Sequence, residues 1–203
     1  MPFANPIRRA YLHRMTSSSA TTGSDRLLAG LPADADRAQR YPVERWHPPH
    51  CGHSQMAIDS EGRWFHEGGE IKRPELVRLF ARLLRRESSG QHVLVTPVEM
   101  LDIDVADAPL IATDMTSEGS GRERVLRFLI GATGDWITAD ETHRLVIESN
   151  EQGPRPYLTL DVGLRARLNR PVYYALAELA LAEDADSAGL WSAGSFFTLE
   201  EAA

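Results

Sequence analysis

The stretch Ile71-Lys72-Arg73-Pro74-Glu75-Leu76-Val77-Arg78-Leu79-Phe80-Ala81-Arg82-Leu83-Leu84 predicts an amphipathic helix. Pro74 suits the first helical turn, where its missing N–H group leaves no hydrogen bond unmade. Gly90 lies shortly after the expected end of the helix. The apolar residues that recur on one face of a 3.6-residue period are Leu76, Val77, Phe80, Leu83 and Leu84.

The chain contains a second helix of this kind, from about Pro171 to Glu183. Both helices begin with an apolar-x-Arg-Pro sequence, and a leucine follows each arginine by six residues (Leu79 and Leu176). Each is accompanied by strands, a small turn with glycine and a hairpin. The matching order predicts an internal duplication with a repeat distance of roughly a hundred residues.

Short apolar and β-branched runs around the helices predict strands, beginning with a hairpin of Met56–Ile58 and Trp64–His66 across a Gly-ended turn. The expected fold class is α+β, with two similar, mostly antiparallel sheet-plus-helix units. The second helix is apolar over most of its circumference. We therefore expect sheet to cover one side of it and something else to cover another. Further strands are expected at His92–Val95, Val98–Val105, Leu110–Ala112, Val125–Ile130, Trp136–Thr138, Leu145–Ile147, Tyr157–Val162, and in a closing hairpin of Leu190–Trp191 and Phe196–Phe197.

Composition divides the chain into a disordered tail at 1–40, an N-terminal unit at 41–106 and a C-terminal unit at 107–203. The tail is rich in Ser, Thr, Ala and Arg and lacks the apolar core of a secretory signal. A transit peptide would share this composition, and Met15 is an alternative start. The single cysteine, Cys51, fits a reducing cytoplasm.

The net charge of −7 argues against a general binder of DNA or RNA, which needs a basic surface. It leaves room for a small anionic ligand held by a few local arginines. The sequence contains no apolar run long enough to span a membrane, so we expect no membrane partner.

Two groups of residues carry metal-ligand chemistry. His47, His50, Cys51 and His53 form the first, but their spacing matches no zinc motif and Pro48-Pro49 stiffens the run. Asp102, Asp104 and Asp107 form the second, and alternate carboxylates on a strand are more typical of a solvated face. We expect no metal and no cofactor.

Other motifs that could carry a function also have purely structural explanations. Gly119-Ser120-Gly121-Arg122 can cradle a phosphate but lacks the Lys-Ser/Thr of a P-loop, so a hairpin turn is the better interpretation. Ser192 and Ser195 near Gly194 have the wrong spacing for a nucleophile elbow. Arg73 and Arg170 add positive charge where the helix dipole is already positive, so each needs an acidic partner or an anionic ligand.

Residues over nearly all of the globular chain resemble a bacterial family known as domain of unknown function 1285. The stretches that carry the resemblance are Trp46–Gly52, Ile58–Trp64, Ile71–Phe80, Leu94–Glu99, Val105–Pro109, Gly163–Leu168 and Gly189–Phe197. The resemblance implies a two-part α+β fold with internal duplication, and a second part superficially similar to pleckstrin-homology domains. It also implies a ligand site where the parts meet, with a nucleotide-based ligand and a signalling role suspected. The sequence departs from the family pattern at Ile130-Gly131, where a Thr-Asn pair is usual.

The resemblance also suggests which residues line that site. Arg73 and Arg167 would meet phosphate. Thr96 and Ser192 would supply hydroxyl hydrogen bonds. Glu99 would orient an arginine or accept a hydrogen bond from a base, and Trp191 would stack or pack.

We therefore expect a cytoplasmic, non-enzymatic module that binds a small anionic, nucleotide-like ligand. An enzyme acting on such a ligand is one alternative, with His143 or Glu99 as its acid or base. A structural adaptor that binds an unknown protein partner through an exposed apolar patch is the other.

Overall fold

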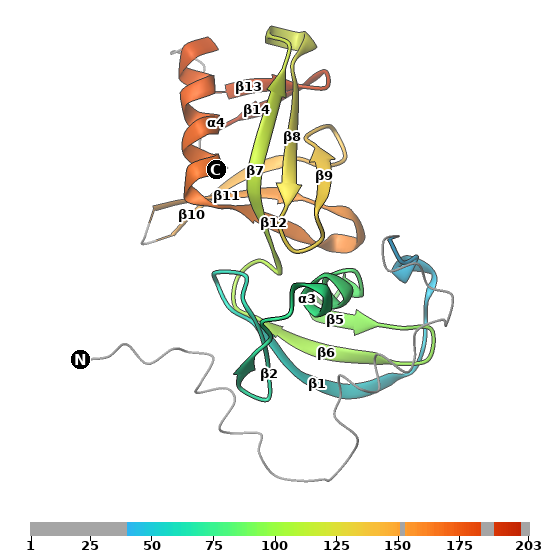
Figure 1. Ribbon diagram of the computed structural model, residues 1–203. Helices are drawn as coiled ribbons and strands as arrows, with labels where there is room; N and C mark the ends of the chain where they lie inside the picture. Colours follow the sequence, from blue (N-terminus) through green and yellow to red (C-terminus); the bar gives the residue numbers. More distant parts are fainter. Residues whose placement is uncertain (1–39, 151–152, 184–188, 200–203) are drawn as a thin grey trace, which may run out of the picture. The chain divides into compact units, whose positions relative to one another are not determined.

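The computed structural model describes residues 40–150, 153–183 and 189–199. The predicted N-terminal tail lies outside these residues, apart from Arg40. The described residues form two compact units, with the division after Pro109 (Figure 1). Each unit is considered by itself below.

The first unit contains one six-stranded sheet and one short helix, and its strand order is β3-β2-β1-β6-β5-β4. Its elements are η1 (Val43–Arg45), β1 (His50–Ile58), β2 (Trp64–His66), β3 (Gly69–Glu70), α3 (Pro74–Ala81), β4 (Leu84–Arg86), β5 (His92–Val95) and β6 (Met100–Val105).

The second unit contains a six-stranded sheet of order β10-β11-β12-β7-β8-β9, a longer helix and a separate hairpin. Its elements are β7 (Leu110–Glu118), η2 (Gly121–Glu123), β8 (Val125–Ile130), β9 (Asp135–Thr138), β10 (Leu145–Asn150), β11 (Gly153–Thr159), η3 (Asp161–Gly163), β12 (Arg165–Leu168), α4 (Arg170–Glu183), β13 (Gly189–Ser192) and β14 (Ser195–Thr198).

The two sheets have the same topology. In each, the first three strands step outward from the centre, and the last three step back to it. The first and sixth strands therefore pair in parallel at the centre, β1 with β6 and β7 with β12, while the other pairs are antiparallel. This confirms the predicted α+β class and the two similar units.

The helices do not occupy matching places in this topology. Helix α3 lies between the third and fourth strands of its unit, whereas α4 follows the sixth strand of the other. The shared apolar-x-Arg-Pro sequence therefore does not mark equivalent positions. The duplication is visible in the order of the strands rather than in the two helices that suggested it.

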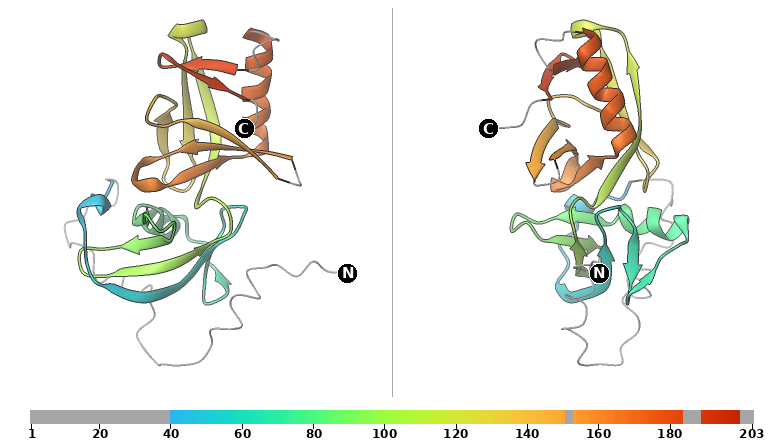
Figure 2. Two further views of the ribbon diagram at one scale, coloured as in Figure 1. Left: turned by 180° about the vertical axis from the view of Figure 1, so that it is seen from behind. Right: turned by 90° about the vertical axis from the view of Figure 1, so that its left-hand side faces the viewer.

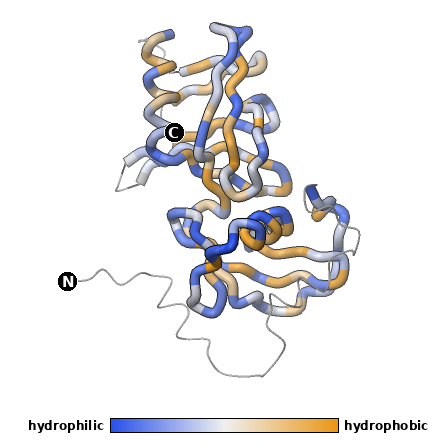
Figure 3. Tube along the Cα trace, in the orientation of Figure 1, coloured by the Kyte–Doolittle hydropathy of each residue, from blue (hydrophilic) through white to orange (hydrophobic). Residues whose placement is uncertain are grey.

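The core of the first unit packs α3 against the sheet. The ring of Phe80 stacks on Trp64 of β2 with centroids 6.3 Å apart, and both side chains are buried. The predicted hairpin is confirmed, because Ile58 pairs with Trp64 and Met56 pairs with His66. Figure 3 draws β5 in hydrophobic colours, in keeping with its buried Val93–Val95 segment.

The predicted first helix is too long at its C-terminal end. It ends at Ala81, and Leu84 begins strand β4, where it pairs with Leu94 of β5. Leu83 and Leu84 are buried as predicted, but they belong to the sheet side of the core. A helical period cannot be told from a strand over so few apolar residues until the pairing partner is known.

The second unit places α4 beside β7 and the β13–β14 hairpin (Figures 1 and 2). Val172, Leu176 and Ala180 of α4 are buried there, together with Leu190 and Phe197 of the hairpin. The closing hairpin is as predicted, and its central Ala193 and Gly194 both have positive φ, as a type I′ turn requires. No helix in the described ranges is long and apolar enough to cross a membrane.

Candidate functional site

Three of the predicted ligand residues lie in the first unit. Arg73 is the N-cap residue of α3, and its exposed side chain makes no hydrogen bond or ion pair with the described residues. Thr96 is buried in the β5–β6 turn, where its Oγ1 accepts from the N–H groups of Val98 and Glu99 and donates to the Glu99 carbonyl oxygen. Glu99, three residues later in the chain, is also buried. These hydrogen bonds already use the Thr96 hydroxyl within the turn, and its ligand role stays a prediction.

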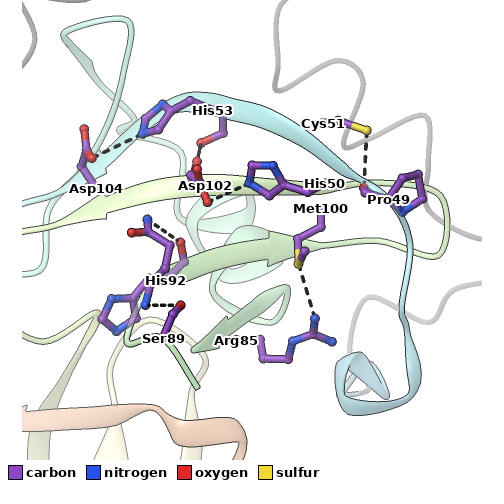
Figure 4. A network of polar contacts seen from close by, with 12 residues as sticks. Pro49, His50, Cys51, His53, Arg85, Ser89, His92, Met100, Asp102 and Asp104 are labelled. Carbon is purple, nitrogen blue, oxygen red and sulfur yellow. Dashed lines mark hydrogen bonds and ion pairs between the residues drawn. The ribbon is translucent and has the colours of Figure 1, made fainter. Parts of the chain in front are cut away.

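Members of the two predicted metal-like groups lie side by side in the first unit, His50 and His53 on β1 and Asp102 and Asp104 on β6 (Figure 4). His50 Nε2 is 3.0 Å from Asp102 Oδ1, and His53 Nε2 is 3.3 Å from Asp104 Oδ1. The pairing of β1 with β6 brings these side chains together. Two register shifts interrupt the β1–β6 ladder, one on each side of His53.

These contacts use the ring nitrogens within the protein. His53 Nδ1 accepts a hydrogen bond from the N–H of Gln55 at 2.9 Å, and its Nε2 lies at ion-pair distance from the Asp104 carboxylate. Cys51 donates to the carbonyl oxygen of Pro49 at 3.4 Å. Among the described residues, no group of three or more His, Cys, Asp or Glu side chains is arranged to hold a metal ion. The network fastens β1 to β6.

Ser192 lies in the second unit and is fully buried. Its Oγ accepts the N–H of Leu126 at 2.9 Å and donates to the carbonyl oxygen of Ala139 at 2.6 Å. The hydroxyl thus fastens the β13–β14 hairpin to the start of β8 and to the end of β9. Its predicted ligand role is not supported by any further contact here and stays a prediction.

Trp191, the neighbour of Ser192, is half-buried and lies against the exposed side chains of Arg122 and Phe196 in a group that we name the aromatic–arginine cluster. The Arg122 guanidinium carbon lies 4.6 Å from the centroid of the Trp191 ring, and Phe196 lies 5.2 Å from it at a 58° tilt. Arg122 is exposed and makes no ion pair with the described residues, and Phe196 is 41% exposed. The cluster combines a positive charge with two aromatic rings.

Local backbone geometry sets the positions of these three side chains. A Cβ at Gly189 would lie 2.6 Å from the Phe196 ring, so the ring sits where only glycine leaves room. Gly119 and Gly121 take positive φ in the turn between β7 and β8, which delivers Arg122 to Trp191. The preferred interpretation of Gly119–Arg122 as a hairpin turn is therefore correct.

Arg167 lies on β12 in the second unit, on a face of the sheet that carries further arginines. Arg167 is paired with Tyr157 across the β11–β12 ladder, and Arg165 lies on the same face with its guanidinium 4.0 Å from the Tyr157 ring. Arg155 extends this face along β11. Glu148 bonds to Arg165 at 2.8 Å. Glu148 thus neutralises Arg165 on this face, and the predicted contact of Arg167 with phosphate stays a prediction.

His143, the predicted acid or base of the enzymatic alternative, lies between two carboxylates. Its Nδ1 is 3.5 Å from Asp140 Oδ1 and its Nε2 is 3.5 Å from Asp161 Oδ1. Val162, next to Asp161, has φ of 53°, which is rare for a β-branched residue. The sequence alone does not connect Asp161 with His143, because the position of Asp161 follows from the turn after β11.

The departure at Ile130-Gly131 has a local explanation. Ile130 is buried at the end of β8, and the N–H of Gly131 donates to the carbonyl oxygen of Ile111 at 3.0 Å. A Cβ at Gly131 would lie 2.7 Å from Thr113 Cγ2. A larger residue in this position therefore requires Thr113 to move.

The fold and these residues define a class: an α+β protein of two units that repeat one six-stranded mixed sheet. The chain belongs to the DUF1285 family. The N-terminal domain of this family, a domain of unknown function, matches residues 41–108, and its C-terminal domain matches residues 109–199. The resemblance seen in the sequence is thereby confirmed.

Two solved structures are similar to the chain. A DUF1285 family protein from Silicibacter pomeroyi DSS-3 is 37% identical, with a TM-score of 0.79 over 90% of this chain and 97% of that one. A DUF1285 family protein from Shewanella baltica OS155 is 25% identical, with a TM-score of 0.47 over 61% of this chain and 90% of that one. No curated protein matches the chain.

The structure brings together only some of the predicted ligand residues. Trp191 and Ser192 are neighbours on β13, and Thr96 and Glu99 share one turn. Arg122 and Phe196 were not among the predicted site residues. The Gly-rich turn that carries Arg122 was noticed, but nothing in the linear sequence indicates that it lies against Trp191.

Proposed function

We propose that this protein is a non-enzymatic binding module for a small, planar, anionic ligand of the nucleotide class, with a regulatory role. The observation that carries the proposal is the contact between Arg122 and Trp191, with Phe196 beside them. A guanidinium group recognises phosphate through directed hydrogen bonds. An exposed aromatic ring stacks on any nucleobase, and such stacking contributes about 1–3 kcal/mol for each base.

The charge of the cluster supports an anionic ligand. The chain carries a net charge of −7, so its overall field does not attract anions. Binding then depends on a local cation such as Arg122, which is exposed and has no carboxylate partner among the described residues. An anion that reaches Arg122 adds the favourable partner that the side chain lacks.

The chemistry of the three side chains supports a binding role over a catalytic one in this proposal. Arg122, Trp191 and Phe196 include no carboxylate, imidazole or thiol that could move a proton near neutral pH. A module that binds a nucleotide without changing it is suited to act as a sensor, because its ligand-bound state is itself the signal. The phosphate contacts expected of Arg73 and Arg167 are separate predictions and not part of this proposal.

A thermal-shift screen tests the proposal. The purified chain is heated with mononucleotides, dinucleotides, cyclic nucleotides, adenosine and inorganic phosphate. A ligand present at a hundred times its dissociation constant stabilises the folded state by about 2.7 kcal/mol, which raises the melting temperature. We expect a nucleotide to exceed both adenosine and phosphate, because it engages the rings and the arginine together.

Two arginine variants sharpen the test. Arg122→Ala should reduce the shift to about half or less, whereas Arg127→Ala should retain it in full. Arg127 is a matched control because it is also exposed, and it pairs with Glu118 away from Trp191. No shift with any compound, or an equal shift in Arg122→Ala, would count against the proposal.

An enzyme acting on the same ligand class is a second candidate. The position of His143 between Asp140 and Asp161 favours it. Incubation of the chain with each nucleotide, followed by chromatography, separates the two roles. A product that forms with the native chain but not with His143→Asn would favour the enzyme, and unchanged nucleotide would favour the binding module.

A further inference from the structure

Helix α4 leaves one side without a described partner. Val172, Leu176 and Ala180 face the rest of the unit, where α4 contacts β7 and β13. The opposite side is exposed and carries two large apolar side chains beside charged ones, with Tyr174 at 59% and Leu181 at 62%. Side chains of this size and character on one helical stripe are typical of an interaction site. The exposed residues of α4 are Arg170, Pro171, Tyr174, Ala175, Glu178, Leu181 and Ala182, which we name the outer face of α4.

The charges on α4 are arranged against its own dipole. Arg170 lies at the first position, where the helix end is already positive, and the last turn contains no basic residue. Arg170 makes no ion pair or side-chain hydrogen bond with the described residues. A cation at the positive end and none at the negative end is unfavourable for an isolated helix.

We propose that the outer face of α4 binds the outer face of a second copy, with the two helices antiparallel about a twofold axis near Leu176. This arrangement brings each Arg170 beside the negative C-terminal end of the other helix, which supplies the missing complement at both ends. An isologous contact of this kind forms a closed dimer.

The side chains on the outer face are complementary to themselves in this register. Tyr174 of one copy lies opposite Glu178 of the other, so the phenol O–H can donate to the carboxylate. Leu181 lies opposite Pro171 of the second copy, which gives an apolar contact at each end. Ala175 and Ala182 have small side chains, which allows the helices to approach closely.

Antiparallel order is preferred over parallel order by the same charges. A parallel pair in register would place Arg170 beside Arg170 and Glu178 beside Glu178, and like charges that face one another are destabilising. One helix face is smaller than a standard interface, so we expect a weak, reversible dimer.

Sedimentation velocity of the full chain over a wide concentration range tests the dimer. We expect a monomer–dimer equilibrium that Leu181→Glu weakens about tenfold or more, because it places a carboxylate in the apolar contact. Val98→Glu is the matched control, since Val98 is 60% exposed and lies in the first unit. It should leave the equilibrium unchanged. A monomer at every concentration, or a dimer that Leu181→Glu leaves intact, would overturn the proposal.

Disulfide trapping tests the antiparallel register. Tyr174→Cys and Glu178→Cys are prepared separately, each with Cys51→Ser, and then mixed under mild oxidation. Opposed residues come within the Cα separation that a disulfide allows, about 4.4–6.8 Å. We expect the mixture to form a cross-linked dimer of unlike chains faster than either variant alone. Cross-linking of like chains only, or none at all, would contradict this register.

Discussion

Asp59 is the most heavily used side chain of the first hairpin. It is 4% exposed, and its Oδ1 accepts the N–H groups of Glu61 and Arg63 at 2.9 Å each. Its Oδ2 accepts Nε and Nη2 of Arg63 at 2.7 Å. The Asp59 carboxylate raises the pKa of the Arg63 guanidinium, through this hydrogen bond first and through its charge second. One carboxylate thus defines the turn between β1 and β2.

Asp59→Ala should lower the free energy of unfolding by about 1–3 kcal/mol, because it leaves two part-buried N–H groups and the Arg63 guanidinium without this acceptor. Urea unfolding followed by circular dichroism measures the change. Asp59→Asn retains one acceptor oxygen and should recover about half of the loss. An Asp59→Ala chain as stable as the native one would show that the turn does not depend on this carboxylate.

Ser192 separates a structural role from a ligand role. Its hydroxyl is 0% exposed and already bonds Leu126 N–H and the Ala139 carbonyl oxygen. Ser192→Ala should therefore lower the free energy of unfolding by about 1–3 kcal/mol, since both backbone groups lose a buried partner. Under conditions in which the variant is fully folded, its affinity for the ligand should change little. A variant of unchanged stability that loses nucleotide binding would instead support the ligand role.

The candidate residues illustrate what a sequence can indicate. Trp191 and the Gly119–Arg122 turn each carried a chemical signal by residue type. Their contact depends on the β7–β8 hairpin and on the β13–β14 hairpin folding over it, which are long-range events. Thr96 and Ser192 have hydroxyl groups suited to a ligand. Both are buried and hydrogen-bonded to the backbone, which the sequence does not show.

Among the elements, α3 depends on a single tertiary contact more than on its own sequence. It has eight residues, and isolated helices of that length are unstable in water. Phe80→Ala removes the ring that stacks on Trp64 and should lower the free energy of unfolding by about 3–4 kcal/mol. Denaturant unfolding measures this, with the exposed Glu75→Ala as a control expected within about 0.5 kcal/mol of the native chain. Equal effects for the two variants would contradict this view of α3.

The elements that sequence periodicity predicted well have local causes. The β1–β2 hairpin has its polar turn, the β13–β14 hairpin has Ala193-Gly194, and α4 has a long apolar pattern. Of the strands that escaped prediction, β4 and β12 depend on partners that are remote or not recognisable in the sequence. Leu84–Arg86 continued a helical pattern until β5 paired with it, and Arg165–Leu168 pairs in parallel with β7.

The whole molecule is organised by repetition of a sheet. The predicted duplication is real, yet the Arg-Pro match that suggested it joins helices at different places in the two topologies. Short sequence matches can arise by chance, whereas a shared order of six strands with a central parallel pair is a stringent criterion. The likeness of the second unit to pleckstrin-homology domains stays a prediction.

The net charge of the whole chain predicts that DNA and RNA are not its partners. With a net charge of −7, the protein should not retard duplex DNA or structured RNA in a gel-shift assay at physiological salt. Single nucleotides have no extended phosphate backbone, so they escape most of this repulsion and can still bind Arg122. Retardation that weakens steeply with added salt would contradict the expectation.

The central claim is that Arg122 and Trp191 together hold a nucleotide-like anion. Isothermal titration of the full chain with the best nucleotide from the thermal screen tests it most directly, alongside Arg122→Ala and Arg127→Ala. Loss of a charge-assisted hydrogen bond worth about 1.5–3 kcal/mol should weaken binding to Arg122→Ala about tenfold or more. Arg127→Ala should bind as the native chain does. Equal affinity of the native chain and Arg122→Ala, or no heat of binding at all, would contradict the account.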